Sequence, residues 1–318
     1  SDRIDGGALR GGNLFHSFQE FNVGDGAGVY FSNPQGIDNI FGRVTGNNIS
    51  NILGTLGVLG NANLFLVNPA GLVFGPNARL NIGGSFVGTT ANSVIFDDGN
   101  FYSATNPNAP PLLTVNVPIG LQLSNPGEIR VTGNGTSGRF PDRDDGLAAS
   151  PGRTFALVGG DVTINGGIVA AESGRIEIGS AVAGEVSFTP APVGWRLGYE
   201  GVGEFGEVRL SDRSSVWNPN RNSFPNSGIQ IEGRRIVLEE RSQIVSTTEG
   251  SQPGGDILVN ASETLEIGGG IDNVRPFASG IMSRVEEGAT GSGGAVIVSA
   301  PQLRLFDGGR ISSLSFGS

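Results

Sequence analysis

One stretch constrains the fold more than any other part of the chain: residues 56–87 repeat an apolar pair at a fixed interval. The two residues of a pair are two positions apart, and each pair lies eight residues after the last: Leu56 and Val58, Leu64 and Leu66, Leu72 and Phe74, Leu80 and Ile82. This spacing places both side chains of a pair on one face of an extended strand. Glycine, asparagine and proline between the pairs supply the backbone conformations that corners require. Such regular alternation of strands and corners predicts that the chain winds around a common axis as a β-solenoid.

The last third of the chain repeats in sets of three short strands. The first apolar residues of these strands are Ile229, Ile236 and Ile244, then Ile257, Leu265 and Ile281, then Val296, Leu303 and Ile311. Strands that each pair with the strand one coil away, about 4.8 Å off, make a three-sided helix. We therefore predict an all-β, right-handed, three-sided parallel β-helix. A β-sandwich also has strands at short intervals, but it needs hairpins, and the strong hairpin dipeptide Asn-Gly occurs only at Asn134-Gly135 and Asn165-Gly166.

Irregular stretches interrupt this single predicted domain, which spans residues 1–318. The expected divisions are an aromatic amino-terminal cap with a short antiparallel piece at 1–48, coils at 49–240 with insertions near 97–111, 133–153 and 189–206, and repeat coils at 228–318. Further strand pairs are expected at Val94/Phe96, Val162/Ile164, Ile168/Ala170, Ile176/Ile178 and Val186/Phe188. The last residues lie within a repeat, so we expect the natural protein to continue.

Charge and composition exclude several classes of partner and cofactor. The formal net charge is −10, and the 318 residues include no lysine. Nucleic acids and anionic membrane surfaces are bound through clustered positive charge, so neither is an expected partner. The chain contains no apolar run long enough to span a membrane, so membrane insertion is not expected. With one histidine and no cysteine, zinc and haem sites are not expected, and we predict no metal site and no cofactor.

Three patterns are compatible with catalysis or ion binding, and each has a plainer interpretation. His16 lies among apolar residues and is expected to be structural rather than part of a Ser/His/Asp centre. The run from Asp142 matches the start of a calcium loop, but its twelfth position is Arg153 instead of a bidentate glutamate. A pectin-lyase-like enzyme would need paired carboxylates, and the candidate pairs Asp97-Asp98 and Asp144-Asp145 both fall in predicted loops. We therefore predict no catalytic residues and no enzyme activity.

Two runs of sequence resemble a known family. They are Ile40-Phe41-Gly42-Arg43-Val44-Thr45-Gly46-Asn47-Asn48-Ile49-Ser50 and Leu64-Phe65-Leu66-Val67-Asn68-Pro69-Ala70-Gly71-Leu72, with Phe21-Asn22-Val23 ahead of them. Over about residues 9–120 the chain is similar to the secretion domain of the two-partner secretion family, the filamentous-haemagglutinin-like exoproteins of Gram-negative bacteria. The family signature NPNGI corresponds to Asn68-Pro69-Ala70-Gly71-Leu72, which departs from it at the third and fifth positions. The second signature, NPNL, has no clear counterpart beyond Asn33-Pro34.

The resemblance implies a role in export. The family's domain crosses the periplasm unfolded and is recognised there by the periplasmic domains of a dedicated outer-membrane β-barrel transporter. It then folds first at the cell surface and templates the later coils. The implied localisation is therefore secreted or cell-surface, by way of the periplasm. The candidate partner-binding residues are Phe21, Asn22, Val23, Asn33, Pro34, Asn68, Pro69, Ala70, Gly71 and Leu72.

Two other interpretations stay open beside the export role. Residues 68–71 also fit a β-turn in which Asn68 caps its own backbone, Pro69 fixes φ and Gly71 takes a positive φ; this turn is compatible with partner recognition. The second alternative is an adhesin that binds host or surface glycans. For that role Trp195, Tyr199 and Trp217 are expected to be exposed on insertions, where aromatic rings can stack on sugars.

Overall fold

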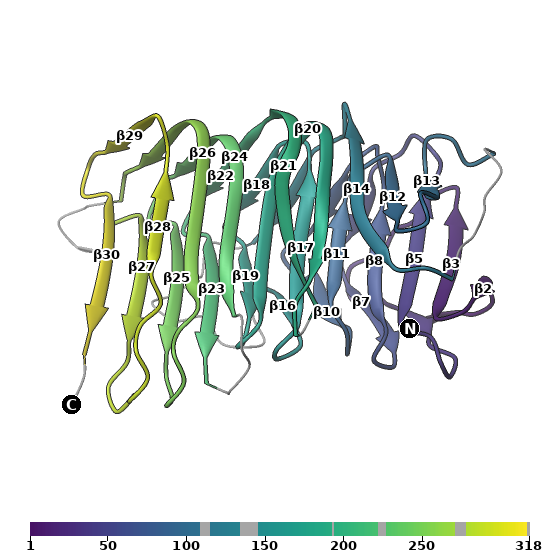
Figure 1. The fold of residues 1–318 in the computed structure, drawn as a ribbon, viewed down its shortest axis with the longest axis horizontal. Helices are drawn as coiled ribbons and strands as arrows, with labels where there is room; N and C mark the ends of the chain where they lie inside the picture. The colour runs from purple at the N-terminus through teal and green to yellow at the C-terminus, as the bar shows by residue number, and fades with distance from the viewer. Residues whose placement is uncertain (109–114, 134–145, 193, 222–226, 271–277, 317–318) are drawn as a thin grey trace.

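The fold is a stack of coils whose regular secondary structure consists entirely of β-strands. The computed structural model describes residues 1–108, 115–133, 146–192, 194–221, 227–270 and 278–316, and within these ranges it contains strands and no helix. The coils follow one another along a single axis from the amino-terminal end to the carboxyl-terminal end (Figure 1). Successive coils pair in parallel along three sides, which confirms the predicted all-β, three-sided parallel β-helix. No helix within the described ranges is long and apolar enough to cross a membrane.

The first side is one continuous parallel ladder. Its strands are β3 (Asn13–Phe18), β5 (Asn39–Val44), β8 (Asn63–Val67), β11 (Phe86–Thr89), β17 (Thr154–Gly159), the first part of β20 (Arg175–Pro190), the first parts of β24 (Gly228–Leu238) and β26 (Asp256–Ile267), and β28 (Val296–Ser299).

The second side follows each first-side strand after a corner. Its strands are β6 (Ser50–Ile52), β9 (Leu72–Phe74), β15 (Ile129–Thr132), β18 (Val162–Asn165), β22 (Glu207–Ser211), the second parts of β24 and β26, and β29 (Gln302–Leu305).

The third side closes the triangle and is split into two sheets. The amino-terminal sheet contains β1 (Asp2–Ile4), β4 (Gly28–Ser32), β7 (Thr55–Leu59) and β10 (Arg79–Asn81). The second sheet contains β16 (Leu147–Ala149), β19 (Ile168–Ala171), β23 (Ser215–Asn220), β25 (Gln243–Thr248), β27 (Gly280–Val285) and β30 (Arg310–Ser315).

The apolar repeats predict the register of these ladders. Ile229 pairs with Ile257, and Ile257 pairs with Val296 on the first side. The other two predicted columns pair in the same way: Ile236, Leu265 and Leu303 on the second side, and Ile244, Ile281 and Ile311 on the third. The four pairs at 56–82 likewise mark four successive strands, β7 to β10. Stacked side chains of this kind fill the interior of the helix as one continuous core.

Five strands form an antiparallel layer outside the helix. They are β13 (Phe101–Ser103), β12 (Ser93–Phe96), β14 (Pro118–Ser124), the second part of β20, and β21 (Trp195–Phe205), paired in that order. This outer sheet packs on the outward face of the first side and encloses a second apolar core. The helix contributes Phe15, Phe41, Phe65 and Val87 to that core, and the sheet contributes Phe96, Tyr102, Leu121, Val186 and Phe188.

The outer sheet corrects several expectations about strands and loops. Val94/Phe96 and Val186/Phe188 lie in its antiparallel strands instead of helix coils. The insertion expected at 189–206 contains an ordered strand, β21, and the one expected at 97–111 contains β13. These segments are apolar on one face because they cover the helix, and a period of two cannot distinguish such a strand from a coil strand.

Three further expectations differ from the structure. In the region predicted as an irregular cap, β3 and β5 already pair in parallel with β8, and only β2 (Ala8–Arg10) adds the expected antiparallel strand. Strand β16 lies inside the stretch predicted as a loop at 133–153. On β19, Val169 and Ala171 point into the core in place of Ile168 and Ala170. Residues 134–145, which include Asn134-Gly135, the calcium-loop candidate from Asp142 and Asp144-Asp145, lie outside the described residues.

Candidate partner-recognition site

The signature segment forms the corner between β8 and β9. Asn68 Oδ1 accepts a hydrogen bond from the Ala70 amide at 3.0 Å, and the Gly71 amide donates to the Asn68 carbonyl at 3.1 Å. Gly71 has a φ of 139°, and a Cβ there would lie 3.2 Å from the carbonyl oxygen of Glu128 on the next coil. A side chain at this φ would be strained, and it would also be in tight contact with the next coil. These contacts confirm that residues 68–71 form the predicted turn, with glycine required at its end.

Asn68 also joins two coils. Its side chain is fully buried, and its Nδ2 donates to the Asn48 carbonyl at 3.0 Å and to Ser50 Oγ at 2.9 Å. Ser50 begins β6, the strand that pairs with β9, so Asn68 fixes the height of one corner above the previous one. Every polar atom of this side chain is thereby hydrogen-bonded inside the protein, as burial requires.

Phe21, Asn22 and Val23 lie two coils before the signature segment, on the same side. The Val23 backbone forms a bridge with Ile52, and Asn22 Oδ1 accepts a hydrogen bond from the Asn51 amide at 2.9 Å. The Phe21 ring is buried and packs against Phe18 and Phe31, with centroids 5.1 and 5.9 Å away. The fold therefore brings the two expected recognition segments, 21–23 and 68–72, onto the second side, with β6 between them.

Asn33 and Pro34 lie at a different corner, between β4 and β5. Asn33 Oδ1 accepts a hydrogen bond from the Ala62 amide at 3.0 Å, and its Nδ2 donates to the Ile37 carbonyl at 3.0 Å. Asn33 thus links two coils as Asn68 does, but where the third side meets the first. The structure does not bring this segment together with the other two.

A groove of about 440 Å³ runs beside the signature corner. Its neutral lining consists of Val44, Thr45, Gly46, Asn47, Pro69, Ala70, Ala104, Thr105 and Pro107. Arg43 fixes its wall, because the guanidinium lies 4.5 Å from the Tyr102 ring centroid and donates to the Ser103 carbonyl at 2.6 Å. The candidate site residues predicted from sequence did not include Arg43. They also did not include the lining residues at 44–47 and 104–107. The only signals were the motif run at 40–50 and the Asn106-Pro107 corner.

Burial divides the ten candidate residues. Phe21, Val23, Asn68, Gly71 and Leu72 are buried, with Asn68 and Leu72 at 0 % exposure. Asn22 and Pro34 are exposed. Asn33, Pro69 and Ala70 are half-buried. The folded domain therefore displays only part of these segments, and the side chain of the signature asparagine is not on its surface.

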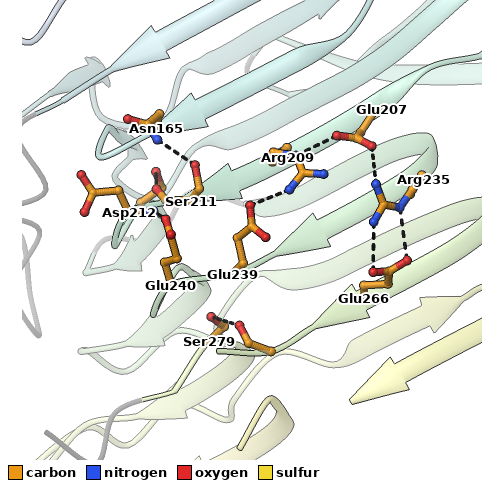
Figure 2. A network of polar contacts seen from close by, with 12 residues as sticks. Asn165, Glu207, Arg209, Ser211, Asp212, Arg235, Glu239, Glu240, Glu266 and Ser279 are labelled. Carbon is orange, nitrogen blue, oxygen red and sulfur yellow. Dashed lines mark hydrogen bonds and ion pairs between the residues drawn. The ribbon is translucent and has the colours of Figure 1, made fainter. Parts of the chain in front are cut away.

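Charge appears on the second side only beyond this region. Over the first coils its outward residues are Asn22, Asn51 and Val73, which are uncharged. On later coils a network of ion pairs crosses successive strands, as Figure 2 shows. Arg235 binds Glu207 on β22 at 2.8 Å and Glu266 on β26 at 3.0 Å, and Arg209 bonds Glu207 and Glu239 at 2.8 and 2.5 Å.

The residues considered for catalysis do not assemble into a centre. His16 is buried on β3 against Phe31, and burial lowers the pKa of its imidazole. Asp97 and Asp98 are exposed in the turn between β12 and β13, where Asp98 bonds Asn100. Among the described residues no three His, Asp or Glu side chains are grouped as metal ligands would be. These residues provide no support for the enzymatic alternative.

The aromatic residues that were expected to be exposed on insertions are buried or half-buried. Trp217 lies on β23 of the helix and is 4 % exposed, and Tyr199 on β21 is 7 % exposed. Trp195 is half-buried and packs against Phe65, with centroids 5.3 Å apart. All three rings help to fill apolar clusters, so the expected display of sugar-stacking rings is wrong.

Comparison with known proteins identifies the family. The family model for the TPS secretion domain, the domain of two-partner secretion, matches residues 2–231. The chain belongs to the TPS secretion domain family. This family consists of secretion domains of exoproteins and is not an enzyme family, and its exoproteins are secreted through the outer membrane with a partner transporter.

Three individual proteins are similar to this TPS secretion domain. The heme/hemopexin-binding protein of Haemophilus influenzae is 32 % identical over 83 residues, which are 26 % of this chain and 9 % of that protein. The chain therefore matches a small part of that relative's length. The HMW1 secretion domain of Haemophilus influenzae is 16 % identical, covers 92 % of this chain and 94 % of its own, and has a TM-score of 0.41. The filamentous hemagglutinin secretion domain is 16 % identical, with 99 % and 96 % covered and a TM-score of 0.42.

Proposed function

We propose that this TPS secretion domain is recognised by the periplasmic domains of its cognate outer-membrane transporter through residues 21–23 and 68–72. The recognised state is the unfolded chain. The burial of these segments carries this proposal, because Asn68 and Leu72 are inaccessible in the folded domain and Val23 is 1 % exposed. A partner that reads these side chains must meet them before the first coils close. Folding then withdraws them from the partner and ends the contact.

The same domain is proposed to template the coils that follow it after export, as one continuous domain. Each coil pairs in parallel with the next and presents the unpaired backbone edge to which that next coil adds. The register of the later ladders supports this role, because Ile229, Ile257 and Val296 occupy equivalent positions on three successive coils. Apolar stacking therefore favours one register at each addition.

The test compares two buried asparagines that both precede proline: Asn68 in the signature corner, and Asn218 in strand β23. Asn218 precedes Pro219, is 0 % exposed, and donates through Nδ2 to the carbonyls of Ala171 and Gly174 at 2.6 and 3.0 Å. It is thus a matched control for Asn68, which also precedes proline and donates twice from a buried amide. Each alanine variant removes two hydrogen bonds donated by a buried amide, and each is expected to lose about 2–3 kcal/mol of folding free energy.

Secretion is then measured with the transporter co-expressed, beside urea unfolding of each purified variant. The proposal expects Asn68→Ala to block release into the medium while Asn218→Ala is secreted near the unaltered level, at comparable loss of stability. Equal secretion of both variants, or equal impairment, would show that Asn68 is a corner residue and nothing more. A glycan array on the unaltered domain addresses the adhesin alternative, which the burial of Trp217 disfavours.

A further inference from the structure

Glu177 is a buried carboxylate that the export function does not use. It lies on the outward face of the first side, under strand β21 of the outer sheet, and is 0 % exposed. Its Oε1 accepts hydrogen bonds from Arg175 Nε and Nη2 at 2.8 and 2.7 Å. Its Oε2 has no hydrogen-bond partner among the described residues. A buried oxygen without a partner destabilises the ionised carboxylate, because water no longer solvates the charge.

Strand β21 lies against the helix through side chains at this place. Among the described strands β21 pairs only with β20, so its other edge needs different partners. Gln230 Nε2 donates to the Leu197 carbonyl at 3.3 Å, and the Trp195 amide donates to Thr154 Oγ1 at 3.1 Å. The edge of the β20–β21 hairpin is therefore bound by residues of two coils, on β17 and β24, and Glu177 lies on the coil between them.

Tyr199 of β21 packs on the strand that carries the carboxylate. A Cβ added at Gly179 would lie 2.2 Å from Tyr199 Oη, so the hydroxyl end of the ring packs against the glycine two residues after Glu177. Tyr199 Oη is buried and has no hydrogen-bond partner among the described residues. The charged and titratable groups around Glu177 are Arg175 on its own strand, Arg196 and Tyr199 on β21, Glu232 on β24, and Glu200 beyond Glu232.

We propose that Glu177 makes the docking of the β20–β21 hairpin pH-dependent: the hairpin is held more tightly when this carboxyl is protonated and is released more readily when it is ionised. Release would uncover the aromatic residues below the hairpin, including Phe65, against which Trp195 and Phe188 pack with centroids 5.3 and 6.1 Å away. The outer sheet is then a cover whose closure responds to the acidity of its surroundings.

The sign follows from linkage. Burial raises the pKa of Glu177 from 4.5 to about 7, against the opposing effects of Arg175 and the Leu197 backbone. In the undocked hairpin the carboxyl is exposed to water and returns toward 4.5. The docked state therefore binds the proton more tightly, and its advantage falls as pH rises from 4.5 through about 7. For these two values the opening equilibrium increases roughly tenfold between pH 6 and pH 8.

Hydrogen exchange of the β21 amides measures this opening, because on release the Trp195 amide loses its bond to Thr154 Oγ1 and a hairpin that packs on nothing is only marginally stable. After correction for the intrinsic rate, the protection of β21 in the unaltered domain is expected to fall roughly tenfold from pH 6 to pH 8. In Glu177→Gln the protection of β21 is expected to be independent of pH over this range. Glu185→Gln, a change at an exposed glutamate of the same hairpin, is the matched control and should keep the full dependence. Amides of β8 report global opening and should not change with pH in step with β21.

Two results would overturn the proposal: β21 protection that does not change with pH in the unaltered domain, or a dependence that persists in Glu177→Gln. Persistence together with its loss in Glu232→Gln would assign the effect to the neighbouring carboxyl, whose pKa burial also raises. If Glu177→Gln does not fold, carbon NMR of the Glu177 carboxyl in the unaltered domain replaces it. Agreement between its titration midpoint and the midpoint of β21 opening supports the proposal, and a difference above about one pH unit refutes it.

Discussion

Replacing Phe41 with alanine should be among the most destabilising single changes in the domain. Its ring is 0 % exposed and lies in a column between Phe15 and Phe65, with centroids 5.1 and 4.7 Å away, and Phe96 meets it edge-on at 5.3 Å. Deleting a buried phenyl ring removes about 3–5 kcal/mol of folding free energy. Both stacked neighbours also lose an aromatic contact. We expect a loss of about 4 kcal/mol.

The assay is unfolding in urea, followed by circular dichroism, with a thermal melt beside it. A loss of this size corresponds to a fall in melting temperature of about 6 °C for a domain of 318 residues. Phe101 is the control, because it lies on β13 of the outer sheet and is 46 % exposed. Phe101→Ala should change stability by no more than about 0.5 kcal/mol.

A small effect at Phe41 would refute the reasoning. If Phe41→Ala loses less than about 1 kcal/mol, the column of rings between helix and outer sheet is not a packed core. An equal effect at Phe41 and Phe101 would refute it in another way, because burial would then not determine the loss. The denaturant dependence should be the same for both variants, since neither changes the surface exposed on unfolding.

Three other changes test separate parts of the structure. Burial lowers the pKa of the His16 imidazole below its usual 6.5. The stability that depends on neutral His16 is therefore full above pH 6.5 and is lost as the pH falls toward the pKa of the folded state. His16→Phe should remove this loss at acid pH, which is measured by comparing unfolding free energy against pH for the two proteins. Arg43→Met should loosen the outer hairpin β12–β13 by about 3 kcal/mol, measured as faster amide exchange in β13, whereas an unchanged rate would contradict the clamp. Arg235→Gln should lose about 1 kcal/mol at low salt and less at 1 M salt, and a loss independent of salt would argue against the ion-pair network.

The coil register could be read from the sequence because core residues and corners repeat together. Ile229, Ile257 and Val296 occur after comparable corners, and the structure pairs them in order. The turn at Asn68 was predictable from local sequence as well. Asparagine caps the backbone, proline fixes φ, and glycine allows the positive φ that the turn requires. In both cases a local pattern is sufficient, because each strand contacts its nearest neighbours in the stack.

The outer sheet and the burial of the site could not be read in this way. Strand β14 pairs with the second part of β20, through Leu121 and Val186, and no local signal joins segments so far apart. On β19, the run Ile168–Ala171 is apolar on both faces, so alternation cannot select the inward residues. Trp217 resembles a surface aromatic beside an Asn-Pro corner, yet it packs in a cluster with Val245 and Met282.

The outer sheet changes how the coils come apart. In a simple solenoid every coil touches only its two neighbours, so the ends fray one turn at a time. Here β12, β13, β14, β20 and β21 lie across the coils from β3 to β24 and bond to residues on several of them. The coils under the outer sheet must open together, whereas the coils after β24 are not covered by it and can unwind one at a time. The amino-terminal part of the protein should therefore melt as one cooperative block, and the carboxyl-terminal coils should unravel from it before that block yields.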